Sequence, residues 1–206
     1  MTTLVNELSI PNLDAATNDP DELVHLATAL SVLAAYADCK AIAMRFRLRG
    51  EIDLALVTPE STLPELHARR LFDERYVCVM RANHPDAQGG ALSLDRFCEL
   101  DHALVSYIGG SFKGVTDEAL ARLGRERRVT VSVTSFLVLP RILKSSDLIA
   151  VVPYRLVARS RGLVAIEPPL EIPGFTKTAS WHERTHRSPA HRWVRELLFK
   201  TCAALT

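Results

Sequence analysis

The chain has 206 residues, of which 48% are hydrophobic, enough to bury the core of one large domain or two small lobes. Its 25 Lys and Arg residues nearly balance its 24 Asp and Glu residues, so the net charge is +1 with neutral histidines. A chain that grips DNA by its own surface usually carries a clear basic excess, so this balance argues against a self-sufficient nucleic-acid binder. We find no signal peptide and no apolar stretch that would span a bilayer, and expect no membrane partner.

The cysteines and histidines predict no metal site. The four cysteines are far apart and form no Cys-x-x-Cys pair, which argues against zinc binding. Buried free thiols in a reducing compartment are the simplest interpretation, so we expect a soluble cytoplasmic protein. His182 and His186 are four residues apart, but their polar surroundings indicate a loop, not a ligand-bearing helix face.

The first quarter of the chain leads to one short strand. Residues 1–20 are irregular, and apolar residues at helical spacing predict a helix over about 22–38. Residues 40–49 fit either a half-buried strand or a helix. Gly50 can end a helix, and the nearly unbroken apolar run over 52–57 is typical of a strand covered on both faces in a parallel sheet.

Over the rest of the chain, predicted strands alternate with predicted helices, which indicates an α/β fold built from βαβ units. Ser93 is the expected N-cap of the helix over 92–100, and Thr134 and Ser135 are N-cap candidates for the helix over 136–143. Pro140 bends the helix over 136–143 or delays its start. The expected order is strand 76–80, helix 92–100, strand 102–107, helix 115–123 ending at Gly124, strand 129–133, helix 136–143, strand 147–152, helix 154–160, strands 163–166 and 175–181, and helix 188–204.

Candidate ligand-binding residues follow the predicted strands. In open α/β sheets, small ligands bind just beyond the carboxyl ends of strands, so Thr58 is a candidate, although it could equally only cap its strand. Ser135 stands at a strand-to-helix turn, where it caps the helix or leaves backbone N–H groups free for a carboxylate. Tyr107 and Phe136 could supply apolar walls. For His102, a structural role is favoured over that of a polar anchor in a cleft.

Enzyme motifs are missing from the sequence. The glycines of residues 109–114 lack the spacing of a P-loop or of a dinucleotide-binding fingerprint, which favours a plain loop. No Gly-x-Ser-x-Gly elbow and no nucleophile paired with a general base can be found. We therefore expect no enzymatic activity, no cofactor and no metal.

A series of short sequence segments, taken in their order and spacing, resembles the effector-binding domain of LysR-type transcriptional regulators. Five of these segments narrow the resemblance to the branch of the nodulation, naphthalene/salicylate and nitrotoluene regulators: Arg127–Val129, Ser146–Pro153, Pro168-Pro169, Trp181-His182 and His191–Trp193. The resemblance covers about residues 48–198, and residues 1–47 are atypical. The other segments that carry it are Gly50–Leu56, Leu71–Val79, His84-Pro85 and Leu92–Leu94.

This resemblance implies a type 2 periplasmic-binding-protein fold, with two α/β lobes joined by two crossover strands. Lobe one would comprise 1–101 and 173–206, and lobe two 102–172. The effector would bind between the lobes. The nitrotoluene-type pattern has a histidine where Ser135 stands here. By position, the implied ligand-binding residues are Thr58, His102, Ser106, Tyr107, Thr134, Ser135, Phe136 and Phe175.

The function implied is the effector-sensing and oligomerisation module of a transcriptional regulator. The resemblance suggests a small, aromatic effector and a homodimer or higher homo-oligomer. DNA would be bound only through a winged helix-turn-helix, which we do not find in this chain. A solute-binding protein of the same fold that serves transport is the alternative.

Overall fold

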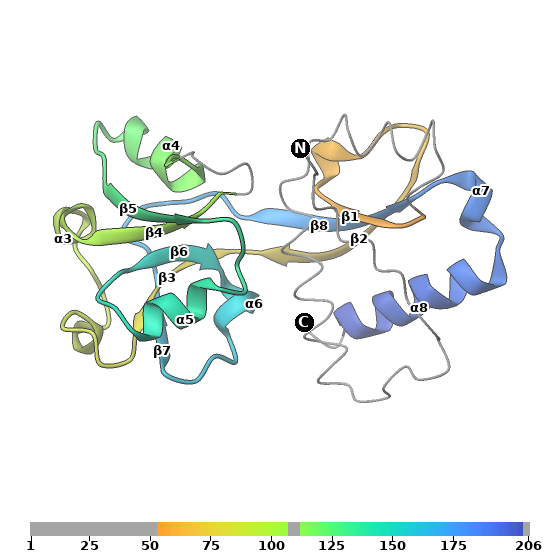
Figure 1. Cartoon of the computed structure of the whole chain (residues 1–206). Coiled ribbons are helices and arrows are strands. Elements are labelled where there is room, and N and C mark those ends of the chain that lie inside the picture. Colours follow the sequence, from red (N-terminus) through yellow and green to blue (C-terminus); the bar gives the residue numbers. More distant parts are fainter. Residues whose placement is uncertain (1–52, 107–111, 204–206) are drawn as a thin grey trace.

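The computed structural model describes residues 53–106 and 112–203, so the predicted helix over 22–38 and the ambiguous residues 40–49 lie outside the described part. Two lobes lie side by side, and strands β2 and β8 extend from lobe one to the junction between them (Figure 1). The elements are β1 (Ala55–Val57), η4 (Pro59–Ser61), β2 (His67–Glu74), β3 (Tyr76–Arg81), η5 (Ala87–Gly89), α3 (Leu94–Glu99), β4 (Asp101–Val105), α4 (Val115–Arg122), β5 (Arg128–Val133), α5 (Leu139–Lys144), β6 (Ala150–Pro153), α6 (Tyr154–Val157), β7 (Leu163–Ile166), β8 (Phe175–Trp181), α7 (Glu183–His186) and α8 (Pro189–Ala203).

Lobe one is built on a sheet with the strand order β1-β8-β2. Both outer strands run antiparallel to β8, so β1 has an antiparallel neighbour where the sequence predicted a parallel one. The apolar residues of β1 and β8 face helix α8, whose Leu198 and Phe199 pack against Leu56, Ala179 and Trp181. The described core of lobe one is therefore small and lies between this sheet and α8 (Figure 1).

Lobe two contains a larger layer of strands. Strands β6, β3 and β7 form one antiparallel sheet, and β4 and β5 form a parallel pair. A parallel bridge between His102 and Ile149 connects them, with hydrogen bonds from the Ala103 N–H to the Ile149 oxygen at 2.8 Å and from the Ile149 N–H to the Asp101 oxygen at 3.0 Å. The strands of lobe two thus lie in the order β5-β4-β6-β3-β7.

The sheet of lobe two is covered on both faces, and β3 shows why. Side chains alternate between the two faces of a strand. Val77 and Val79 point into a core shared with α5 and α6, whereas Cys78 and Met80 point into a second core shared with α3 and α4. Because both faces are buried, the strand carries an unbroken apolar run.

Strands β2 and β8 are the crossovers that join the lobes. The long β2 pairs with β8 from His67 opposite Trp181 to Glu74 opposite Phe175. Gly174 precedes β8 and lies so close to the end of β2 that a Cβ atom there would be 2.3 Å from the carbonyl oxygen of Glu74. Because glycine has no side chain, the crossover strands β2 and β8 can lie this close together.

Lobe two starts earlier in the chain than the predicted boundary at residue 102. Strand β3 pairs with β6 and β7, and Phe97 of α3 packs in a core with Leu120 of α4. The chain therefore enters lobe two directly after β2. The prediction placed the boundary just before the strand predicted over 102–107. In the structure, the boundary is the end of the crossover strand β2.

Some of the predicted helix ends are confirmed and one is wrong. Ser93 caps α3 as predicted, with its Oγ accepting a hydrogen bond from the Arg96 N–H at 3.1 Å. Helix α4 ends before Gly124, whose φ of 64° lies in the left-handed region. The prediction that Thr134 or Ser135 caps α5 is wrong, because this helix starts at Leu139 with Val138 at its N-cap. Pro140 in the first turn explains the late start.

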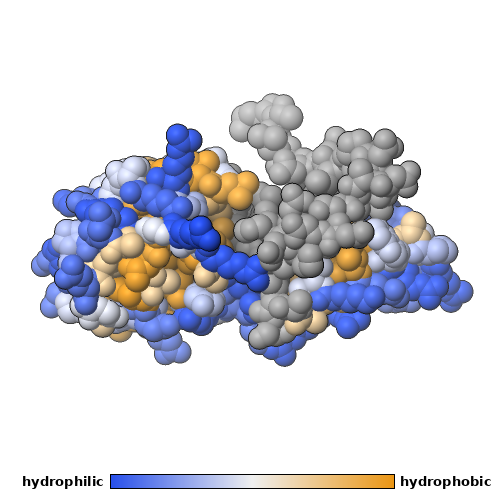
Figure 2. All heavy atoms as spheres, turned by 90° about the horizontal axis from the view of Figure 1, so that it is seen from below, coloured by the Kyte–Doolittle hydropathy of each residue, from blue (hydrophilic) through white to orange (hydrophobic). Residues whose placement is uncertain are grey.

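Apolar side chains gather on lobe two when the molecule is seen from below (Figure 2). The turn before α5 is one source of exposed apolar surface in this lobe, since Leu137 is 67% and Val138 49% exposed. Exposed apolar patches often mark contact surfaces. Among the described residues, no helix is both long and apolar enough to cross a membrane.

Candidate functional site

The residues that end β4 and β5 meet at one edge of lobe two. These strands are parallel, so their carboxyl ends lie at the same edge. Ser106 follows β4, and its N–H donates to the Val133 oxygen of β5 at 2.8 Å. Thr134 and Ser135 follow β5. The structure therefore brings together three of the predicted hydroxyl-bearing residues at the edge where α/β sheets bind ligands.

Ser135 has a local partner, which differs from the predicted helix cap. Its Oγ accepts a hydrogen bond from the Leu137 N–H at 3.2 Å, and the Val138 N–H reaches the Ser135 carbonyl oxygen at 3.4 Å. The hydroxyl thus stabilises a turn ahead of α5. Ser135 is half-buried and Thr134 is exposed, so both side chains keep some surface for a ligand. Tyr107 lies outside the described residues.

Thr58 ends β1 on the side of lobe one. Its Oγ1 lies 3.0 Å from the Ser61 Oγ, and its carbonyl oxygen accepts from the Thr62 hydroxyl at 3.4 Å. The side chain is half-buried. Phe175 begins β8 at the crossover, where its half-buried ring lies 5.6 Å from that of Tyr76. A pair of aromatic rings therefore stands at the junction between the lobes.

His102 is not available as a ligand-binding residue. Its side chain is fully buried, and its Nε2 donates to the Phe97 oxygen at 2.8 Å while Arg127 donates to its Nδ1 at 3.1 Å. Burial and the charge of Arg127 lower the pKa of His102 to about 4. His102 is therefore a neutral structural histidine, the interpretation that the sequence favoured, and its place among the ligand-binding residues is corrected.

Phe136 is likewise a core residue. It is 6% exposed and packs in the same core of lobe two as Leu139 and Val152. The prediction that it forms the wall of a cleft does not fit this burial. An apolar residue after a strand can face the core as easily as a cleft, and the sequence alone does not distinguish the two.

Lys177 is a buried cation in the crossover strand that the sequence did not reveal as special. The side chain is fully buried, and within the described part of the chain its Nζ has no hydrogen-bond partner. The ring of Phe175 lies beside it, with its centroid 5.3 Å from Nζ. Burial lowers the pKa of Lys177 to about 8. An unpaired charge in such a place costs folding free energy.

The pairing of β1 with β8 relates Thr58 to the strand segment that contains Lys177. In the antiparallel pair of β1 and β8, Leu56 lies opposite Ala179 and Val57 opposite Thr178. Extended by one residue beyond the end of β1, this register would set Thr58 opposite Lys177. Residues directly opposite each other share a face, with Cβ atoms about 5 Å apart. The strand end that the sequence singled out thus lies beside the strand that carries Lys177.

Glu74 is the other buried charge at the crossover. Burial raises its pKa, and its carboxylate accepts hydrogen bonds from the Arg75 N–H at 2.9 Å and the Arg155 N–H at 3.3 Å. The Arg155 guanidinium lies 3.7 Å away. Glu74 therefore has partners of its own at the end of β2, in contrast to Lys177.

One cluster in the described part of the chain has the residue types of a metal site. Potential ligand atoms of His67, Glu183 and His186 lie within 4.8 Å of one another. However, the two imidazole rings are stacked, with centroids 4.0 Å apart and planes 16° from parallel. A metal ion bound about 2.1 Å from each nitrogen should lie near both ring planes, which stacking prevents. In addition, the Trp181 Nε1–H occupies Nδ1 of His186 at 3.1 Å. This arrangement does not fit a metal ion.

The family model described as the LysR substrate binding domain matches residues 44–203. The chain belongs to this LysR domain family. It is 34% identical over 158 residues to the transcriptional regulator SyrM 1 of Sinorhizobium fredii, covering 75% of this chain and 46% of that protein. It is 38% identical over 155 residues to the transcriptional activator NagR of Ralstonia, covering 72% and 50%. The chain spans about half the length of these curated relatives.

Solved structures of LysR-type regulatory domains have the same fold. The regulatory domain of MexT from Pseudomonas aeruginosa matches with a TM-score of 0.60 and 30% identity, covering 74% of each chain. The effector-binding domain of QuiR, solved with shikimate, matches with a TM-score of 0.62 over 92% of each chain, but at 14% identity this likeness shows the fold alone. The predicted branch of the LysR family and the predicted fold class of two lobes with two crossovers are confirmed. This LysR domain has relatives named as transcriptional regulators, not as enzymes or transport proteins.

Proposed function

We propose that this LysR domain senses a small aromatic effector that binds between its lobes. The observation that carries the proposal is the shared edge at which β4 and β5 end, with Ser106, Thr134 and Ser135 on it. Hydroxyl groups at such strand ends suit the few directed hydrogen bonds that orient a ligand in a mostly apolar site. Phe175 and Tyr76 would provide apolar contacts at the crossover.

The unpaired amine of Lys177 favours an effector with a negative charge. The amine is fully buried in this conformation, so a carboxylate would reach it only when the lobes move apart, and would then give it the partner that it lacks among the described residues. A hydrogen bond to a charged group is worth about 1.5–3 kcal/mol. The proposal therefore includes a preference for an aromatic acid over the uncharged amide of the same shape.

Effector binding would act on the relative position of the lobes. A ligand shifts the balance between two conformations only by the difference in its affinity for them. A ligand that contacts Thr58 in lobe one and Ser135 in lobe two together would favour one separation of the lobes. In a complete regulator, this change would be passed to a winged helix-turn-helix that binds DNA, and the protein would act in the cytoplasm.

We further propose that the domain forms a homodimer or a higher homo-oligomer. The exposed Leu137 and Val138 on lobe two are candidate contact residues, because large apolar side chains gain free energy when another protein covers them. A transport protein of the same fold is the less favoured function, since the curated relatives are named as regulators.

A ligand screen tests the proposal. The chain is heated in the presence of aromatic acids, phenols and flavonoids, because a compound that binds the native state raises the melting temperature. We expect at least one compound to do so, and Thr58→Val and Ser135→Ala to weaken its binding about fivefold or more. Ser145→Ala, an exposed change elsewhere in lobe two, is the control. The proposal fails if no compound in the panel binds, or if both junction variants bind as well as the control.

A further inference from the structure

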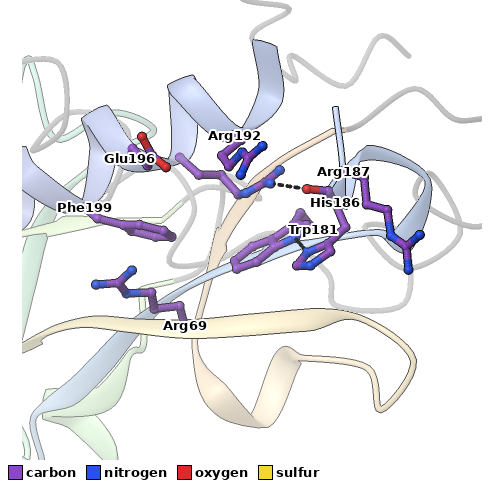
Figure 3. A pocket seen from close by; sticks show the side chains of 8 residues that line it. Arg69, Trp181, His186, Arg187, Arg192, Glu196 and Phe199 are labelled. Carbon is purple, nitrogen blue, oxygen red and sulfur yellow. Dashed lines mark hydrogen bonds between the residues drawn. The ribbon is translucent and has the colours of Figure 1, made fainter. Parts of the chain in front are cut away.

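A pocket in lobe one lies apart from the junction between the lobes. It has a volume of about 540 Å³ and opens between helix α8, the end of β8 and strand β2 (Figure 3). Trp181 in its wall is four residues beyond Lys177 on β8, a separation of about 13 Å along the strand. Binding pockets for small organic molecules have volumes of about 300–1,000 Å³, so this one is large enough for such a ligand.

The pocket carries an excess of positive charge. Arg69, Arg187, Arg192 and Arg195 line it, with Glu196 as the one carboxylate in the lining. Neither Arg69 nor Arg192 forms an ion pair in the described part of the chain, and Arg187 reaches only Glu183 there, at 4.0 Å. An anion in the pocket would therefore meet the guanidinium groups of Arg69 and Arg192, which no described carboxylate pairs with.

Two of these guanidinium groups are held in place by aromatic rings. The Arg195 group lies 4.8 Å from the centre of the Trp181 ring and donates to the His186 oxygen at 2.7 Å and the Thr185 oxygen at 3.2 Å. The Arg69 group lies 4.0 Å from the centre of the Phe199 ring. Groups that are already ordered lose less conformational freedom when a ligand binds.

The charges also repel one another. Arg195 is only 5% exposed, and burial together with the positive charge of Arg192 lowers the pKa of Arg195. A guanidinium remains protonated at any physiological pH, so the repulsion is relieved by a bound anion and not by loss of a proton. The pocket is thus electrostatically suited to an anionic ligand.

We propose that this pocket is a second ligand site, which binds a small organic carboxylate with a flat ring. The guanidinium group pairs with a carboxylate through two parallel hydrogen bonds, which accounts for the charged end of the ligand. The half-buried ring of Phe199, whose centroid lies 6.2 Å from that of the buried Trp181, accounts for the flat apolar end. The volume exceeds what an inorganic anion alone would fill. This site does not depend on effector binding at the junction.

Tryptophan fluorescence provides a local test. The chain contains two tryptophans, so Trp193→Phe leaves Trp181 as the single reporter in the pocket. Trp193 is 47% exposed, and the fold is expected to tolerate this change. The Trp193→Phe chain is titrated with sodium benzoate, benzamide and inorganic phosphate at constant ionic strength. We expect a saturable change in Trp181 emission with benzoate and none with benzamide or phosphate.

Two variants connect the signal to the pocket. Arg69→Gln and Arg192→Gln, made in the Trp193→Phe chain, each remove an exposed charge and are expected to weaken benzoate binding about tenfold or more. Arg192→Lys keeps the charge and should lose less. Arg122→Gln, an exposed arginine of lobe two, is the control and should change nothing, as should Ser135→Ala at the junction. The inference is overturned if benzoate gives no saturable signal, if phosphate or benzamide gives the same signal, or if both glutamine variants bind as well as the control.

Discussion

Arg127 donates two hydrogen bonds to the carboxylate of Asp117, at 2.8 and 2.9 Å, and its own side chain is 1% exposed. Burial by itself raises the pKa of Asp117, but the hydrogen bonds and charge of Arg127 hold it below its usual value. Asp117 also accepts a hydrogen bond from the Gly114 N–H at 2.7 Å. This ion pair therefore fixes the start of α4 to the sheet of lobe two.

Asp117→Asn should destabilise the protein strongly. The substitution removes the negative charge and leaves the buried Arg127 uncompensated, which typically costs about 3–5 kcal/mol. Urea denaturation measures the loss in the free energy of unfolding. Asp95→Asn is the matched control, because Asp95 pairs with Arg125 at the surface, where ion pairs contribute little. Equal losses from the two variants would contradict the structural role given to the buried pair.

His102 should make the protein less stable in mild acid. Its pKa is about 4 in the folded protein against 6.5 in the unfolded chain, so between these values the unfolded chain binds the extra proton. Stability is thus retained above pH 6.5 and lost as the pH falls toward 4, by about 3 kcal/mol in total. His102→Gln does not titrate, so the variant should lose less stability between pH 7 and pH 4.5. A parallel loss in both proteins would show that His102 is not buried as described.

Replacing Lys177 should raise the stability of the protein and remove its preference for a charged ligand. Below pH 8 the amine is charged in both states and its burial cost is complete. Between pH 8 and 10.5 the folded state releases the proton first, so stability rises with pH. Lys177→Met should therefore be about 3 kcal/mol more stable at neutral pH and lack this rise.

The same variant should bind an aromatic acid no better than its amide if Lys177 holds the carboxylate. Lys200→Met, at an exposed position of α8, is the control for both measurements. Urea denaturation at pH 7 and pH 10 measures the stability, and calorimetric titration measures the affinity. Loss of stability in Lys177→Met would mean that the amine has a favourable partner in the folded protein.

Gly174→Ala should disturb the crossover. The added Cβ would lie 2.3 Å from the Glu74 carbonyl oxygen, so the two connecting strands must move apart. Overpacking of this kind typically costs about 1–3 kcal/mol. Gly89→Ala is the control, because no atom of the described residues lies within 4 Å of the position that its Cβ would take. Thermal unfolding compares the two variants, and an unchanged melting temperature for Gly174→Ala would contradict the close approach.

Local patterns in the sequence predicted the elements of lobe two well. The apolar run of β3 and the Ser93 cap depend on neighbouring residues, so a short stretch contains the information. The crossover β2 was not predicted as a strand of its own, because its exposed Arg69 and Arg70 interrupt the apolar pattern and its stability comes from pairing with the distant β8.

The candidate sites depend more on long-range contacts than the individual helices and strands do. Thr58 and Ser135 were predicted as candidates because strand ends are local features, and the family resemblance added Ser106 and Thr134. Lys177 resembles any lysine in a strand until its burial is known, and the arginine pocket assembles side chains from β2, β8 and α8. An excess of lysine or arginine at one place was not visible in a chain with a net charge of +1.

Hydrogen–deuterium exchange of this LysR domain with and without a bound aromatic acid tests the central claim most directly. A ligand between the lobes should slow exchange in two separate segments at once, residues 56–62 after β1 in lobe one and residues 132–138 after β5 in lobe two. The control segment is α4, whose N–H groups should exchange equally in both samples. Protection of one lobe only, or of neither segment, would contradict an effector site between the lobes.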